Sequence, residues 1–222
     1  MDKFTQPDFK SVALITIDTQ RDTLDGQPFE TPGTSLVLPQ MQKLLQIFRQ
    51  HGKPIIHIVR IYKRDGSNVD LCRRQAVLQG SEILIEDTPG CELAAELFPD
   101  QNITLDYQRL LSGDIQSVST NEVIIYKSRW GAFYQTPLNA HLKSLGVSTL
   151  IFTGCNYPHC PRTSIYEASE RDYKIVLVED ALSSLYPQGR EEMNNIGICI
   201  MSTLDLLSLM RSRFAFSGAG VS

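Results

Sequence analysis

The sequence predicts an α/β fold: a doubly wound three-layer sandwich in which helices flank a mainly parallel central sheet. Short runs rich in Val and Ile, without alternating polar residues, are typical of strands that are buried on both faces. These runs alternate along the chain with segments whose apolar residues recur at helical spacing. That order is typical of parallel strands joined by right-handed helical crossovers.

Five strands are expected from these apolar runs. They are VALITID ending at Asp18, PIIHIVRIY ending at Tyr62, EVIIYK ending at Lys127, TLIFTG ending at Gly154 and KIVLVED ending at Asp180. Between the second and third runs, residues 65 to about 120 are punctuated by Gly and Pro. We expect loops and short helices there, over one edge of the sheet.

Four helices are expected, several of which start at a residue that can cap a helix or at a proline. Thr34 can cap the first of them. The expected helices run from Thr34 to Gly52 with Leu36 inward, from Pro137 to Gly146 with Leu145 inward, from Pro161 to about Arg171, and from Glu191 to about Met210.

Composition narrows the class of protein. The 222 residues are 42% hydrophobic and 21% charged, which suits a single domain over residues 1–222. A formal charge of -4 offers no basic face, so a small-molecule ligand is expected rather than nucleic acid. The absence of a leader and of a long apolar run predicts a cytoplasmic protein without a membrane span.

Five cysteines, an odd number, indicate reduced thiols. The final segment SGAGVS is expected to be disordered or to reach a neighbouring subunit.

Reactive side chains follow three of the expected strands. Asp18 ends the first strand, Lys127 ends EVIIYK, and Cys160 lies in the loop GCNYPHC after TLIFTG. Ligands of open α/β sheets bind at the carboxyl ends of the strands. We therefore expect these three side chains to meet at one edge of the sheet, where a base, a cation and a thiol can form an activated nucleophile.

Each of the three residues also has a structural interpretation. Cys160 opens a helix, where the dipole would lower its thiol pKa, but it can equally be a small buried residue. Asp18 would have its pKa raised by burial, as a general base requires, or it can cap the next turn. Lys127 can be a surface lysine beside Arg129, and Cys155 is expected in the core.

Three separate segments surround these residues: ALITIDTQRD, EVIIYKSRWGAF and TGCNYPHCPRTSIYEASERDYKIVLVEDA. In order and spacing they resemble the isochorismatase-like cysteine hydrolases, a family that includes nicotinamidases and N-carbamoylsarcosine amidohydrolases. The resemblance implies that Asp18 is the base, that Lys127 holds the charged pair, and that Cys160 attacks an amide-type C–N substrate to form a thioester. It also implies an oxyanion hole from the N–H groups of Asn156 and Cys160, with a cis peptide between Cys155 and Asn156.

Departures from the family pattern narrow the expected chemistry. Isochorismatases of the family lack the cysteine and cleave a vinyl ether, so Cys160 favours an amide. Nicotinamidases carry metal-binding Asp and His residues after the second strand, where this chain reads RIYKRDGSNVD without His. The spacing of Cys155, His159 and Cys160 does not suit zinc either. We therefore expect no metal and no other cofactor, and we expect His57 to be a core or strand-end residue.

The sequence also suggests residues for the pocket and a state of assembly. The loop 62–68 together with Trp130, Phe133 and Tyr157 is expected to line the pocket. The resemblance implies a homo-oligomer, a dimer or a tetramer. One alternative is an inactive family member that only binds a small molecule. Another is a nucleotide-binding or flavodoxin-like module, although the chain has neither GxGxxG nor GxxxxGK[ST] after a strand.

Overall fold

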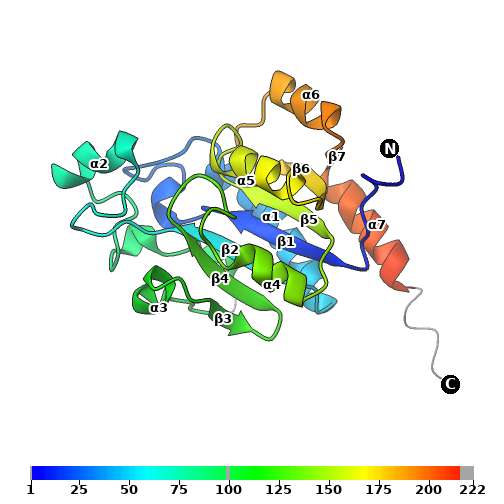
Figure 1. Ribbon diagram of the computed structural model, residues 1–222, viewed down its shortest axis with the longest axis horizontal. Helices are drawn as coiled ribbons and strands as arrows, with labels where there is room; N and C mark the ends of the chain where they lie inside the picture. The colour runs from blue at the N-terminus through cyan, green and yellow to red at the C-terminus, as the bar shows by residue number, and fades with distance from the viewer. Residues whose placement is uncertain (1, 99–100, 216–222) are drawn as a thin grey trace.

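A computed structural model describes residues 2–98 and 101–215. In these ranges the strands form one sheet of seven, in the order β3-β4-β2-β1-β5-β6-β7, with only β3 antiparallel to its neighbour (Figure 1). The strands are β1 (Val12–Ile17), β2 (Ile55–Arg60), β3 (Gln116–Ser119), β4 (Glu122–Lys127), β5 (Thr149–Gly154), β6 (Lys174–Leu182) and β7 (Cys199–Met201). The predicted α/β class and mainly parallel sheet are confirmed.

The five predicted strands correspond to β1, β2, β4, β5 and β6. The last residue of each strand lies within two residues of the predicted last residue. β1, β2 and β5 are buried at every position, as strands covered on both faces must be. β3 and β7 lie at the two edges of the sheet and were not predicted. β3 alternates half-buried and exposed residues and β7 has only 3 residues, so neither gives a continuous apolar run.

Helices cover both faces of the sheet. α1 (Thr34–Gln50) and α7 (Thr203–Ala215) pack on one face, while α4 (Leu138–Ser144) and α5 (Cys160–Ser169) pack on the other (Figure 1). α6 (Pro187–Asn195) lies beside β7. The layers therefore place two apolar cores on opposite sides of one sheet.

The last predicted helix, from Glu191 to about Met210, is wrong. This segment contains the end of α6, the strand β7 and the start of α7. Gly197 has a φ of 79°, a conformation that ends a helix rather than continuing it. The short strand then follows, and its three residues pair with β6.

Three details of the other helices also differ from expectation. Leu36 on α1 is 80% exposed and Leu145 after α4 is 45% exposed, so neither faces the core. Thr34 does not cap α1, because the cap position is Gly33 and the Thr34 hydroxyl donates to the carbonyl of Thr31. The bounds of α1, α4 and α5 otherwise agree with the prediction to within two residues.

The connection between β2 and β4 has the irregular structure that its Gly and Pro content predicts. It contains α2 (Leu71–Leu78), the 3-10 helices η2 (Pro89–Cys91) and η3 (Ala95–Leu97), α3 (Tyr107–Leu111) and the edge strand β3. A further 3-10 helix, η1 (Arg21–Thr23), follows β1 and lies beside η2. A small apolar core that includes Tyr62, Val69 and Val77 holds the first part of the connection.

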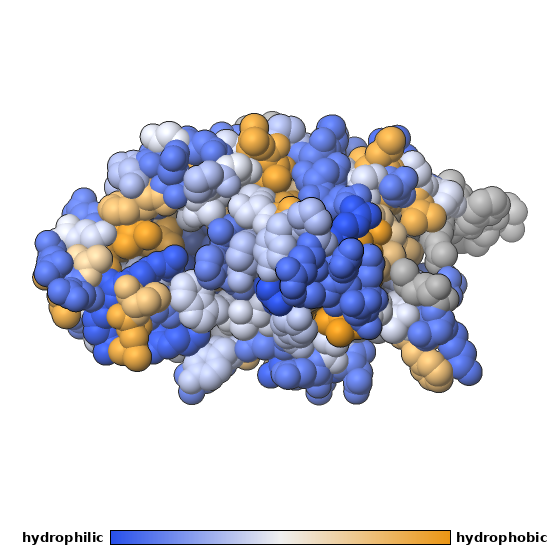
Figure 2. Space-filling model, turned by 90° about the horizontal axis from the view of Figure 1, so that it is seen from above, coloured by the Kyte–Doolittle hydropathy of each residue, from blue (hydrophilic) through white to orange (hydrophobic). Residues whose placement is uncertain are grey.

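The molecular surface in the view from above is mostly hydrophilic, with apolar residues in separate small groups (Figure 2). No helix within residues 2–98 and 101–215 is long and apolar enough to cross a membrane. The expectation for the segment SGAGVS lies outside the described residues.

Candidate active site

Strand register brings the candidate residues to one end of the sheet. Ile17, the last residue of β1, pairs with Gly154, the last residue of β5. On the other side of β1, the order continues through β2 to β4, where Lys127 is the last residue. Because these strands are parallel, Asp18, Lys127 and the loop that leads to Cys160 leave the sheet at its carboxyl edge. The site lies where the chain order switches direction between β1 and β5.

Asp18 and Lys127 form a buried ion pair. Lys127 Nζ lies 2.8 Å from Asp18 Oδ2, and the two side chains are 0% and 8% exposed. Lys127 Nζ also donates to the carbonyl of Arg129 at 3.2 Å. The second carboxylate oxygen, Asp18 Oδ1, is buried and has no hydrogen-bond partner among the described residues. One oxygen of Asp18 is therefore held by a cation while the other can accept a proton.

Cys160 is the first residue of α5 and is 6% exposed. The expectation that the helix N-terminus lowers its pKa is wrong for this protein. Burial raises the pKa of the Cys160 thiol to about 12, and the charge of Asp18 adds to the rise, although Lys127 and Arg60 act in the opposite direction. The sulfur is therefore a protonated thiol at neutral pH, beside a carboxylate.

The loop between β5 and α5 has a defined conformation. Gly154 has a φ of 112°, and a Cβ at this position would meet the carbonyl oxygen of Ile17 at 2.3 Å. The amide of Cys155 donates to that same carbonyl at 2.9 Å, and the amide of Tyr157 donates to Ser183 O at 2.8 Å. The reversal at the end of β5 therefore requires glycine.

The cis peptide implied between Cys155 and Asn156 is not present: no described peptide bond is cis. The turn contains the positive φ of Gly154 and is flanked by the backbone hydrogen bonds that Cys155 and Tyr157 donate. The backbone amides of Asn156 and Cys160 donate to no acceptor within the described residues. Both N–H groups are thus available at the start of α5.

A cavity of about 320 Å³ lies over these residues. Its lining residues are Asp18, Thr23, Pro28, Phe29, Glu30, Thr31, Arg60, Arg73, Ile83, Leu84, Trp130, Cys155, Asn156, His159 and Cys160. Among the residues expected to bind substrate, Trp130 lines the cavity. The loop 62–68 does not line it, but Arg73, Ile83 and Leu84 of the same connection do.

Phe133 and Tyr157 were expected at the pocket but lie in the apolar core. Phe133 is 5% exposed and its ring lies 5.9 Å from that of Tyr173. Tyr157 is fully buried, and its hydroxyl donates to the carbonyl of Gly189 at 2.9 Å. The sequence does not distinguish Phe133 and Tyr157 from Trp130, which lines the cavity, because all three residues follow the end of a strand.

Arg60 is a site residue that the sequence analysis missed. It ends β2, pairs in register with Lys127, and is only 1% exposed. Its Nη2 lies 3.8 Å from Cys160 Sγ. A charged residue that closes an apolar strand was the signal that selected Asp18 and Lys127, and PIIHIVR carries the same signal.

His57 is a core histidine, as expected. It is fully buried in β2, and its two ring nitrogens contact Thr16 and Glu122. Within the described residues no group of three or more His, Cys, Asp or Glu side chains is arranged to hold a metal ion.

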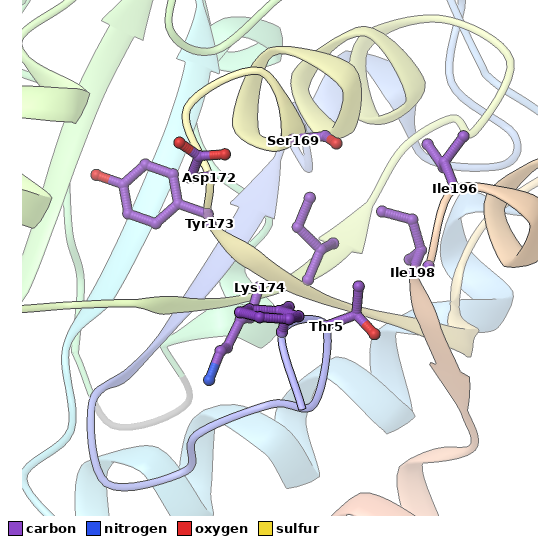
Figure 3. A pocket seen from close by; sticks show the side chains of 10 residues that line it. Thr5, Ser169, Asp172, Tyr173, Lys174, Ile196 and Ile198 are labelled. Carbon is purple, nitrogen blue, oxygen red and sulfur yellow. The ribbon is translucent and has the colours of Figure 1, made fainter. Parts of the chain in front are cut away.

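A second cavity of about 400 Å³ lies at the opposite end of the strands, where β6 and β7 begin. It is lined by residues around the amino end of β6, including Lys174, and by Ile196 and Ile198 before β7. Figure 3 shows Asp172 and Tyr173 on one side and the two isoleucines on the other. None of the candidate residues Asp18, Lys127 and Cys160 lines this second cavity.

Comparison with known proteins identifies the family of this chain. The isochorismatase domain model matches residues 12–196. A probable inactive nicotinamidase of Arabidopsis thaliana is 28% identical over 86% of this chain and 91% of its own length. The N-carbamoylsarcosine amidase of an Arthrobacter species is 25% identical over 79% of this chain and 60% of its own length.

Solved structures give the same result. An isochorismatase family protein from Desulfovibrio vulgaris has a TM-score of 0.76 and 29% identity, covering 90% of this chain and 98% of its own. The resemblance seen in three sequence segments is confirmed, and the chain belongs to the isochorismatase family of hydrolases.

Proposed function

We propose that this protein is a cysteine-dependent hydrolase that cleaves an amide-type C–N bond of a small molecule through a thioester. The observation that carries the proposal is that Cys160 and Asp18 line one cavity, while Lys127 holds Asp18 in a buried ion pair. A thiol, a base and a cation that holds the base are the parts that nucleophilic catalysis requires. Relatives named as amidases support the class of bond.

The first half of the reaction forms the thioester. Cys160 Sγ attacks the amide carbonyl carbon while its proton passes to Asp18 Oδ1, the carboxylate oxygen without a partner in the described structure. Because the thiol pKa is about 12, proton transfer accompanies the attack and no free thiolate needs to accumulate. The amides of Asn156 and Cys160 receive the carbonyl oxygen as it becomes negative.

The second half releases the products and restores the enzyme. Asp18 gives its proton to the leaving nitrogen, the C–N bond breaks, and ammonia or an amine departs. Water then attacks the thioester carbonyl, Asp18 accepts a proton from that water, and the sulfur leaves. The carboxylic acid product is released and the proton returns to Cys160. Lys127 keeps Asp18 in place throughout through the 2.8 Å contact.

The test is ammonia release from a panel of small neutral and anionic amides, with Cys160→Ser and Cys199→Ser compared. Cys199 is a buried cysteine in β7 outside the cavity, so it provides a matched control. We expect turnover in wild type and Cys199→Ser, none in Cys160→Ser, and an acyl adduct on Cys160 by mass spectrometry after acid quench. Turnover that survives in Cys160→Ser would overturn the mechanism.

A second candidate is a protein that binds a small molecule in this cavity without cleaving it. A relative that shares 28% identity bears the name of a probable inactive nicotinamidase, and the raised pKa of Cys160 suits a thiol at rest. This candidate requires ligand binding with neither ammonia release nor an acyl adduct in the wild-type protein.

A further inference from the structure

Arg60 has a buried donor without an acceptor. Its Nη1 contacts the carboxylate of Asp70, and its Nη2 donates to the carbonyl of Arg129 at 2.6 Å. Its Nε is buried and has no hydrogen-bond partner among the described residues. Buried polar groups in proteins are nearly always paired. Arg74 Nε is unpaired as well, but Arg60, unlike Arg74, lines the cavity, where a ligand can supply the acceptor.

Arg73 comes from a different element but reaches the same place. It lies on α2, its side chain is 36% exposed, and its Nη1 donates to the hydroxyl of Tyr62 at 3.0 Å. The Trp130 ring joins the two arginines: its centroid lies 5.4 Å from Arg60 Cζ and 5.1 Å from Arg73 Cζ. Two guanidinium groups and an aromatic ring therefore form one wall of the cavity.

Positive charge exceeds negative charge at this wall. Asp70 is the carboxylate shared by both arginines, in contact with Arg60 and 4.0 Å from Arg73. Tyr62 adds no charge, because burial raises the pKa of its hydroxyl. Of the acidic residues that line the cavity, Asp18 is paired with Lys127.

Glu30, the other acidic lining residue, lies at the exposed rim and accepts the amide of Gly26 at 2.6 Å. Two cations thus share a single buried anion at the wall. A bound anion would balance the excess positive charge. A planar carboxylate matches the geometry of a guanidinium group.

We propose that Arg60, Arg73 and Trp130 form a subsite for a carboxylate of the substrate, whose amide carbonyl lies against Cys160. The inference rests on the proposed hydrolysis and names its substrate class: short amides that carry a carboxylate. Arg60 Nη2 is 3.8 Å from Cys160 Sγ, so the two functional groups of the substrate are only a few bonds apart. The volume of about 320 Å³ suits a molecule of that size.

Trp130 is the only tryptophan of the chain and therefore reports directly on this subsite. The experiment titrates succinate and succinamide, which share a carbon skeleton but differ in charge, into wild type and Cys160→Ser at constant ionic strength. Tryptophan emission is the readout. We expect saturable binding of succinate to both proteins, and at least tenfold weaker binding of succinamide.

Variants of α2 supply the matched comparison. Arg73→Met is expected to weaken succinate binding at least tenfold, and Arg73→Lys is expected to recover part of the loss. Arg74→Met is the control, because Arg74 is the next residue of the same helix, donates to the carbonyl of Val69, and does not line the cavity. It is expected to bind succinate within twofold of wild type, with circular dichroism as the check on folding.

Equal affinity for succinate and succinamide, or unchanged binding in Arg73→Met, would overturn the subsite. The change in tryptophan emission does not require the Cys160 thiol. The experiment therefore tests the carboxylate subsite independently of the proposed hydrolysis. Ammonia release without charge-selective binding would contradict only the subsite. Charge-selective binding without ammonia release or an acyl adduct would contradict only the hydrolase.

Discussion

His57 Nε2 lies 2.8 Å from Glu122 Oε1, and this contact joins β2 to β4 inside the sheet. Arg49 of α1 donates to the same carboxylate at 2.6 Å. Burial alone would raise the pKa of Glu122, but hydrogen bonds from His57 and Arg49 lower it to about 2. Burial lowers the pKa of His57, so its ring is neutral, with Nε2 donating to Glu122 and Nδ1 accepting from Thr16.

Both shifts predict loss of stability in acid. The unfolded His57 gains a proton below its ordinary pKa of 6.5, whereas the folded ring resists it. Glu122 contributes stability above its ordinary pKa of 4.5 that is lost as the pH falls toward about 2. We expect the Glu122 share to reach about 3 kcal/mol.

Denaturant unfolding at a series of pH values tests this expectation, with Glu122→Gln as the comparison. The variant should be less stable than wild type at pH 7, and the difference should shrink below pH 4. An unfolding free energy of wild type that stays constant from pH 6 to pH 3 would be incompatible with these shifts.

Asp18→Asn should separate thiol acidity from catalysis. The Asp18 charge raises the pKa of Cys160, and removing it leaves the Lys127 cation unpaired near the sulfur. We expect the thiol pKa to fall below about 12 and iodoacetamide to alkylate Cys160 faster at pH 7.5. Amide turnover should nevertheless fall by about 10²- to 10⁴-fold, because the base is lost.

Mass spectrometry locates the adduct, and ammonia release measures turnover. Asp65→Asn is the control, because Asp65 is exposed and lies outside the cavity. Slower alkylation of Cys160 in Asp18→Asn would show that the carboxylate does not control the thiol in this way.

Lys127→Met should destabilise the fold. It leaves the carboxylate of Asp18 buried without its cation, a change that typically costs about 3–5 kcal/mol. Lys143→Met removes an exposed lysine of α4 and should change stability by less than about 0.5 kcal/mol. Urea unfolding compares the two, and similar values for both variants would contradict a structural role for the ion pair.

Gly154→Ala should lower the free energy of unfolding by more than the positive φ of this residue alone explains. Gly154 and Gly113 have φ values of 112° and 93°, but a Cβ at Gly113 meets nothing within 4 Å, whereas at Gly154 it meets Ile17 O at 2.3 Å. We expect Gly154→Ala to lose at least about 2 kcal/mol more than Gly113→Ala. Thermal unfolding of both variants measures the difference, and equal losses would argue against the close approach of β1.

The sequence predicts the interior of this fold better than its edges. β1 and β5 appear as unbroken apolar runs because both of their faces are covered. β7 has no such signature, and its 3 residues were absorbed into a predicted helix. Local pattern therefore identifies a strand where the surrounding layers impose burial along most of its length.

The sequence likewise predicts some residues of the candidate site and not others. Asp18 and Lys127 could be placed because each ends a parallel strand, and Arg60 could have been placed by the same rule. Arg73 could not, because its position depends on how the irregular connection folds back over the cavity. The raised pKa of Cys160 was missed because it depends on the depth of burial, which helix position does not reveal.

The outermost strands of the sheet are also its shortest. β3 has 4 residues with an irregular register between Ser117 and Ser119, and β7 has 3 residues. Short, irregular rims offer few free backbone groups to an incoming strand, which discourages edge-to-edge aggregation and fibril growth. We therefore expect any assembly of several copies of this chain to use helical surfaces rather than a sheet that continues from one copy to the next.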